Sequence, residues 1–252
     1  MALTVAILVL MTIAIAALVL VPQLLPRRVT VDTVPDRPQA FGREMSWLAV
    51  QTEDVPKLAA TLGLSDLSAA NWNSGLGAIY DLELADALVF ISPPIQGWTF
   101  VASVALPLPA GGSFVDKTWP LLNRLASQFS RVQYFATFPI IDFYAWARFD
   151  DGRPVRAFAA GDAGTIWDIG RSTAEERKLG LSMIELRGIR NRHGDLGGAL
   201  HLHPTEDHVL GVADGWSVNP MTLEGLAFDA GVGWVVYAPQ AWRAERLRVA
   251  AA

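Results

Sequence analysis

The first 26 residues contain an uninterrupted apolar run that limits where this chain can reside. Ala2–Val21 carries no charged residue, and only two threonines interrupt its apolar side chains. Twenty residues in an α-helix rise about 30 Å, which matches the hydrocarbon core of a bilayer. Pro22 and Pro26 follow the run, and neither can continue a helical hydrogen-bond ladder. The pattern predicts a transmembrane anchor over residues 1–26, which contacts membrane lipid through residues 2–25.

A cleaved secretory signal peptide is the alternative interpretation of the same run. Such a signal needs a basic start, a shorter apolar core and a small-residue cleavage site. Nothing basic precedes this run and no A-x-A motif follows it, so the pattern favours an anchor that stays on the chain. Arg27 and Arg28 follow the run directly, and the positive-inside rule then predicts a single-pass protein whose C-terminal domain lies in the cytoplasm.

Charge, cysteine content and missing motifs exclude several classes of function. The net charge of −5 gives no electrostatic footprint for nucleic acid. The absence of cysteine excludes disulfide frameworks, thiolate metal sites and cysteine nucleophiles. The sequence contains neither a P-loop nor the dinucleotide-binding, zinc-protease and serine-hydrolase signatures. We therefore expect no nucleic-acid partner and no cofactor.

Composition divides the rest of the chain into three parts. Residues 27–44 mix charges and two prolines without periodicity, which predicts a linker between membrane and domain. Residues 45–239 are long enough for one substantial core and predict a single globular domain. Residues 240–252 predict a basic helical tail, which either lies on lipid headgroups through Trp242 or is a solvated end.

Strand and helix patterns are interspersed within residues 45–239. Strands are predicted over 46–52, 87–92, 97–106, 140–149 and 154–160, and helices over 55–62, 119–129 and 205–216, with a short capped helix at 172–176. The dipeptide Asp151-Gly152 predicts a tight hairpin, because glycine accepts a positive φ without a Cβ clash. This mixture predicts an α+β fold: a mainly antiparallel sheet with helices packed on one face. A doubly wound parallel sheet is the less favoured alternative.

The strand predicted over 140–149 carries the candidate partner-binding residues. Because side chains alternate along a strand, one face is predicted to be core, with Ile141, Phe143, Ala145, Ala147 and Phe149. The other face is predicted to bind a partner, with Asp142, Tyr144, Trp146, Arg148 and, from the next strand, Arg156. Aromatics interleaved with arginine and a carboxylate are typical of interface hot spots. The alternatives are a stabilising cross-strand set, with an aromatic on guanidinium plus an ion pair, or burial under a second layer such as the 119–129 helix.

Three of the four histidines fall within eight residues, at His201, His203 and His208. On a strand the first two would share a face, which suits a divalent metal. The segment resembles the H-x-H-x-D-H string of metallo-β-lactamase-like hydrolases, with one extra residue before the final Asp-His. The alternative is that Thr205 begins a helix whose dipole the next two acidic residues complement. Because closely spaced polar residues are common at helix starts, the helix interpretation is favoured.

Six short strings resemble those of an uncharacterised family of bacterial proteins. They are MSWLAV (45–50), ANWNSG (70–75), SPPIQGWTFV (92–101), QYFATF (133–138), YAWARF (144–149) and GWSVNP (215–220). The resemblance covers most of residues 45–225 and implies no activity, cofactor or catalytic residue. It implies a bacterial protein, so the predicted location is the bacterial inner membrane. The N-terminal anchor is an addition to the family's pattern.

Three functional hypotheses follow. The leading one is a non-enzymatic, membrane-anchored interaction protein, which is an accessory subunit of a membrane protein complex or an immunity-type binder. The competing one is a membrane-tethered metal-dependent hydrolase that uses residues 201–208. A third is small-ligand binding in a pocket between sheet and helices.

Overall fold

The structure is a computed structural model that describes residues 11, 31–81, 87–162, 164–181, 204–226 and 228–245. The chain divides into two compact units, Met1–Thr30 and Val31–Ala252, and the fold below is that of the second unit. The predicted anchor, apart from one residue, lies outside the described residues. Within the described ranges, no helix combines the length and the apolar character needed to cross a bilayer.

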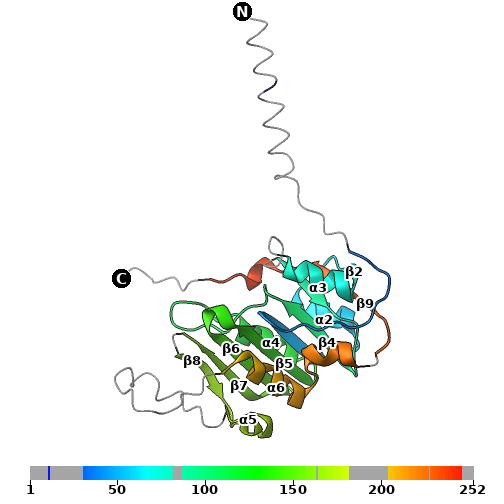
Figure 1. Cartoon of the computed structure of the whole chain (residues 1–252). Coiled ribbons are helices and arrows are strands. Elements are labelled where there is room, and N and C mark those ends of the chain that lie inside the picture. The colour runs from blue at the N-terminus through cyan, green and yellow to red at the C-terminus, as the bar shows by residue number, and fades with distance from the viewer. Residues whose placement is uncertain are drawn as a thin grey trace, which may run out of the picture. The chain divides into compact units, whose positions relative to one another are not determined.

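An antiparallel sheet of nine strands forms the centre of the described part of the chain. In spatial order the strands run β2-β9-β3-β4-β1-β5-β6-β7-β8. Their bounds are β1 Met45–Gln51, β2 Ser68–Asn71, β3 Leu88–Ile91, β4 Trp98–Ser103, β5 Arg131–Phe138, β6 Phe143–Asp150, β7 Arg153–Gly161, β8 Gly164–Ile169 and β9 Val232–Tyr237. Every neighbouring pair is antiparallel. Figure 1 shows the early strand β1, in blue, between β4 and β5. The predicted α+β class with a mainly antiparallel sheet is confirmed.

Short helices pack on the sheet. They are α2 Val55–Leu62, α3 Trp72–Tyr80, α4 Thr118–Ala126, α5 Ala174–Lys178 and α6 Glu206–Trp216, with 3-10 turns η1 Pro139–Ile141, η4 Pro220–Gly225 and η5 Gln240–Trp242. Local signals set several of their ends. The Asp54 side chain accepts the Lys57 N–H at the start of α2, and Gly63 ends that helix with φ 75°.

Helices cover both faces of the sheet, so the prediction that they pack on one face is wrong. Leu122 of α4 belongs to the core cluster that contains Tyr134. On the opposite face the ring of Trp216, from α6, lies 5.8 Å from that of Phe135. Tyr134 and Phe135 are consecutive in β5 and therefore point to opposite faces. The central strands are buried at nearly every position, so each face needs a cover.

The β6–β7 hairpin forms as predicted, but its first strand begins later. Asp151 and Gly152 have φ values of 48° and 77° and join the two strands as a two-residue turn. Ile141 is not a core residue: it lies in η1, before β6, with 55% of its surface exposed. Asp142 turns the chain with φ 52°. The other predicted core positions of this strand are buried.

Residues 31–44 pack on the domain, so the predicted linker does not extend to residue 44. Phe41 is 2% exposed and its ring contacts Trp47 and Phe100 at centroid distances of 6.4 and 5.6 Å. The Asp36 carboxylate accepts the Trp72 N–H at 2.7 Å. A single aromatic in a polar segment gives no periodic signal, and its burial depends on strands far along the chain.

The C-terminal segment also belongs to the domain. Trp242 is 7% exposed and lies in the hydrophobic core, so it is not available to lipid headgroups. Beyond η5, the Val115 N–H donates to the Glu245 carbonyl at 2.9 Å. Residues 240–242 form a short 3-10 turn that packs on the domain, so a tail lying on lipid or solvated at this point is wrong, and residues 246–252 lie outside the described residues.

Candidate functional site

The five predicted partner-binding residues do not form one exposed surface. Trp146 and Arg156 are only 1% and 5% exposed, and Tyr144 is buried over most of its ring. Arg148 is partly buried and Asp142 is exposed. The geometry of Trp146 and Arg156 fits the alternative interpretation, a structural set covered by a second layer.

That cover is α5, not the predicted 119–129 helix, which packs on the opposite face as α4. Glu176 of α5 accepts hydrogen bonds through Oε1 from Trp146 Nε1 at 2.9 Å and from Arg156 Nε at 2.8 Å. Its Oε2 accepts the Thr173 N–H at 2.7 Å, which confirms the predicted capping box. The Glu176 carboxylate therefore takes part in the N-terminal cap of α5 and also fixes α5 to β6 and β7.

Arg156 and Trp146 both contact the ring of Phe158. The guanidinium of Arg156 lies 5.6 Å from the Phe158 ring centroid, and the Trp146 ring stacks on Phe158 at 4.6 Å. The Asp168 carboxylate lies 2.8 Å from Arg156 Nη1. An aromatic ring on guanidinium and an ion pair are present, as in the alternative interpretation, but the ring and the acid are Phe158 and Asp168, which lie outside the predicted set.

Asp142 and Tyr144 lie instead on a second feature, which we call the β5–β6 rim. It is formed where β5 turns into β6, next to the segment before β1 and the start of α6, and consists of Arg43, Thr137, Ile140, Ile141, Asp142, Tyr144 and Glu206. Ile140 and Ile141 form its apolar tip, with 87% and 55% of their surface exposed. Two adjacent isoleucines exposed to this extent leave apolar area in contact with water that no described element covers.

Hydrogen bonds and ion pairs hold the polar part of the rim. Glu206 forms an ion pair with Arg43 and accepts the Thr137 hydroxyl at 3.1 Å. Arg43 also lies 3.9 Å from the Asp207 carboxylate. The side chain of Glu206 is mostly buried, whereas that of Arg43 is half exposed. Contacts within the chain itself therefore fix the polar part of the rim.

Tyr144 in the rim and Tyr80 next to Arg43 both have raised pKa values. Burial raises the pKa of Tyr144 above its ordinary value, and the negative charges of Asp142 and Glu206 raise it further. Burial likewise raises the pKa of Tyr80, whose hydroxyl donates to the Arg43 carbonyl at 3.1 Å. Both shifts disfavour the charged phenolate form.

Two non-glycine residues of left-handed backbone conformation flank these groups. Asp142 has φ 52° and Glu44 has φ 53°. Asp tolerates this region because its short side chain bonds locally, but Glu does so less readily. Backbone strain of this kind is concentrated at functional sites. No sequence pattern identified the rim as a whole, because its members come from three separate segments of the chain.

The histidine segment is described only in part. His201 and His203 lie outside the described residues. His208 Nδ1 accepts the Thr205 N–H at 3.1 Å and completes a capping box at the start of α6, which confirms the predicted helix start. Among the side chains that the structure places, no three of metal-binding type are grouped to hold an ion.

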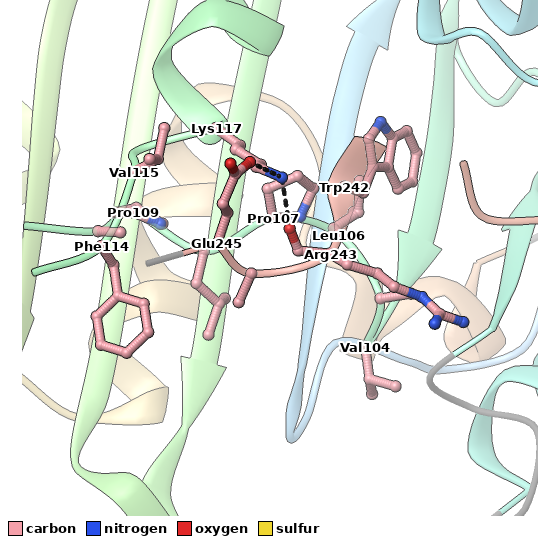
Figure 2. A pocket seen from close by; sticks show the side chains of 14 residues that line it. Val104, Leu106, Pro107, Pro109, Phe114, Val115, Lys117, Trp242, Arg243 and Glu245 are labelled. Atoms are coloured by element: carbon pink, nitrogen blue, oxygen red, sulfur yellow. Dashed lines mark hydrogen bonds and ion pairs between the residues drawn. The ribbon is translucent and has the colours of Figure 1, made fainter. Parts of the chain in front are cut away.

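A cavity of about 480 Å³ lies between the loop after β4 and the C-terminal segment (Figure 2). Two stretches of chain line it: residues 104–110, 114, 115 and 117, and residues 242–245. Its volume falls in the usual range for small-molecule sites. Our third hypothesis places a pocket between sheet and helices, whereas this cavity is built from irregular segments that carry no periodic signal.

Comparison of the chain with family models, curated proteins and solved structures finds no match. The geometry described above therefore carries the functional argument by itself.

Proposed function

We propose that this chain is a non-enzymatic, membrane-anchored interaction protein that contacts a protein partner through the β5–β6 rim. The observation that carries the proposal is the exposure of Ile140 and Ile141, which follow shortly after Thr137 in the chain, where the Thr137 hydroxyl donates to the Glu206 carboxylate of the Arg43–Glu206 ion pair. An accessory subunit of a membrane protein complex and an immunity-type binder both fit this description.

The physical argument concerns what association gains and costs. Burying exposed aliphatic side chains is favourable, and protein interfaces place an apolar centre inside a polar rim. Association is opposed by the loss of side-chain freedom. Here Glu206 is already held by Thr137 and Arg43, so less freedom is lost when a partner binds.

The membrane part of the proposal rests on the sequence. Residues 2–25 contact lipid in the bacterial inner membrane, and Arg27 and Arg28 keep the C-terminal domain in the cytoplasm. Reporter fusions to the C-terminus test this orientation. A cytoplasm-active reporter is the expected result, and activity of a periplasm-dependent reporter would overturn it.

Site-specific photo-crosslinking in native membranes tests the partner. A photoreactive residue in place of Ile140 should yield one discrete protein adduct. The matched control is Val34, an exposed aliphatic residue at 67% that lies outside the rim, and it should not yield that adduct. Identical adducts at both positions, or none at Ile140, would contradict the proposal.

Elemental analysis separates this proposal from the hydrolase that uses His201, His203 and His208. Stoichiometric zinc, manganese or iron in the purified full-length chain, together with a fall in stability on chelation, would favour the hydrolase.

A further inference from the structure

The cavity between the loop after β4 and the C-terminal segment combines an apolar wall with a single lysine. Eight of its lining residues have apolar side chains larger than alanine: Val104, Leu106, Pro107, Leu108, Pro109, Phe114, Val115 and Trp242. Figure 2 shows Phe114 at one side of the cavity and Trp242 at the other. These side chains give the cavity an apolar part, beside polar atoms that line the rest of it, and that part favours an apolar group on a ligand.

Lys117 lies between these walls, at the start of α4. Its Nζ donates to the Arg243 carbonyl at 2.6 Å and lies 3.3 Å from Glu245 Oε2 (Figure 2). The side chain of Lys117 is mostly shielded from water, whereas that of Glu245 is more than half exposed. The partly buried ammonium already holds a carboxylate, and that carboxylate can leave for water at little cost.

Lys117 and Glu245 are the two charged groups that face each other in the cavity. The Arg243 side chain extends away from both of them (Figure 2). The first N–H groups of α4 are not donors to the cavity, because the Asp116 carboxylate accepts those of Thr118 and Trp119 at 2.9 and 3.1 Å. Lys117 is therefore the group that selects the charge of a ligand.

We propose that this cavity binds a small carboxylate with an apolar body, whose carboxylate takes the place of Glu245 on Lys117. The apolar body then lies against Phe114 and Val115, which the cavity leaves at least partly exposed. The site is distinct from the β5–β6 rim and does not depend on the function proposed for it. Glu245 acts as an internal competitor, since it occupies the ammonium when no ligand is bound.

Calorimetric titration of the full chain in zwitterionic nanodiscs tests the proposal, with empty nanodiscs as the blank. The probes are octanoate, octan-1-ol and octylammonium, which share one apolar chain and differ in charge. Octanoate should bind, and the neutral and cationic probes should bind at least about tenfold more weakly, because they lose the charge-assisted contact. Equal binding of octanoate and octan-1-ol, or no binding of octanoate, would overturn the proposal.

Two variants locate the site and remain informative if one of them folds poorly. Lys117→Gln should weaken octanoate binding about tenfold. Glu245→Gln should strengthen it, and misfolding cannot produce a gain. Lys57→Gln is the control. Lys57 lies on α2, where its ammonium sits over the Phe129 ring, and it does not line the cavity. Unchanged binding in Lys117→Gln, or weaker binding in Glu245→Gln, would contradict the assignment.

Discussion

Glu176 Oε1 lies 2.8 Å from Arg156 Nε, and both side chains are almost fully shielded from water. The pair connects α5 with β7, although 20 residues separate its members. A buried charge without its partner is costly, because the protein interior does not solvate it. The pair therefore fixes the position of α5 relative to β7.

Replacement of Arg156 by Met should lower the free energy of unfolding by about 3–5 kcal/mol, since it leaves Glu176 charged and unpaired. Chemical denaturation followed by tryptophan fluorescence measures the loss. Arg148→Met is the control: Arg148 pairs with Asp150 at 2.7 Å, but both side chains are partly exposed, so the loss should be about 1 kcal/mol or less. Equal losses in the two variants would contradict the role assigned to Glu176.

Two glycines of α3 should respond in opposite ways to alanine. A Cβ on Gly75 would lie 2.3 Å from the Phe90 ring, so Gly75→Ala should cost about 1–3 kcal/mol through overpacking. A Cβ on Gly77 would meet no heavy atom of the described residues within 4 Å. Gly77→Ala should therefore stabilise the helix by up to about 1 kcal/mol. Thermal unfolding of both variants checks the contrast, and a shift of the same sign in both would refute the packing of α3 on β3.

Tyr134 should make stability depend on alkaline pH. Burial raises its pKa above the ordinary value near 10, and its hydroxyl donates to the Pro107 carbonyl at 3.0 Å. Above pH 10 the unfolded chain releases this proton while the folded chain retains it, so stability falls as pH rises. At neutral pH, Tyr134→Phe should cost about 1 kcal/mol for the lost hydrogen bond. That deficit should shrink above pH 10, and a deficit that stays constant from pH 8 to 11 would contradict the prediction.

Trp242 should stabilise the domain as a core residue. Trp242→Ala should cost about 3–5 kcal/mol, because it opens a cavity under the C-terminal segment. Tyr237→Ala, at a position 60% exposed, should change stability much less. Urea unfolding of the full chain measures both, and a loss below about 0.5 kcal/mol in Trp242→Ala would mean that this segment is not part of the core.

The apolar tip of the rim should not stabilise the fold. Ile140→Ser and Ile141→Ser should each change the free energy of unfolding by no more than about 0.5 kcal/mol, since both side chains are exposed. For crosslinking of the double variant, the photoreactive residue replaces Asp142 instead of Ile140. This variant should no longer yield the partner adduct. Retention of the adduct would show that the tip does not bind the partner.

Local elements were predictable where neighbouring residues determine them. Helix α2 ends at Gly63 as expected, and the α5 capping box and the Asp151-Gly152 hairpin form at the expected residues. The start of α6 at Thr205 follows the same logic. In each case the signal and the structure it forms lie within about four residues of each other.

The candidate site was less predictable. Alternation along one strand grouped Trp146 and Arg156 with Asp142, but α5 covers the first two and leaves Asp142 on the rim. Periodicity shows which residues share a face and not which element lies over that face. Ile141 was predicted wrongly because η1 and Asp142 reverse the chain over the first three residues of the predicted strand, and β6 begins only at Phe143.

The sequence by itself determined the class of the fold, five of its strands and the local caps and turns, because periodicity, short-range sterics and local hydrogen bonding dictate them. The strands β2, β5, β8 and β9 were not predicted. Only the tertiary structure decided that Phe41 and Trp242 are core residues and that both sheet faces are covered. It also decided which charges pair, as Glu206 does with Arg43 across 163 residues. These outcomes depend on segments that meet only when the whole sheet assembles, so the burial of any one residue is settled by residues far from it in the chain.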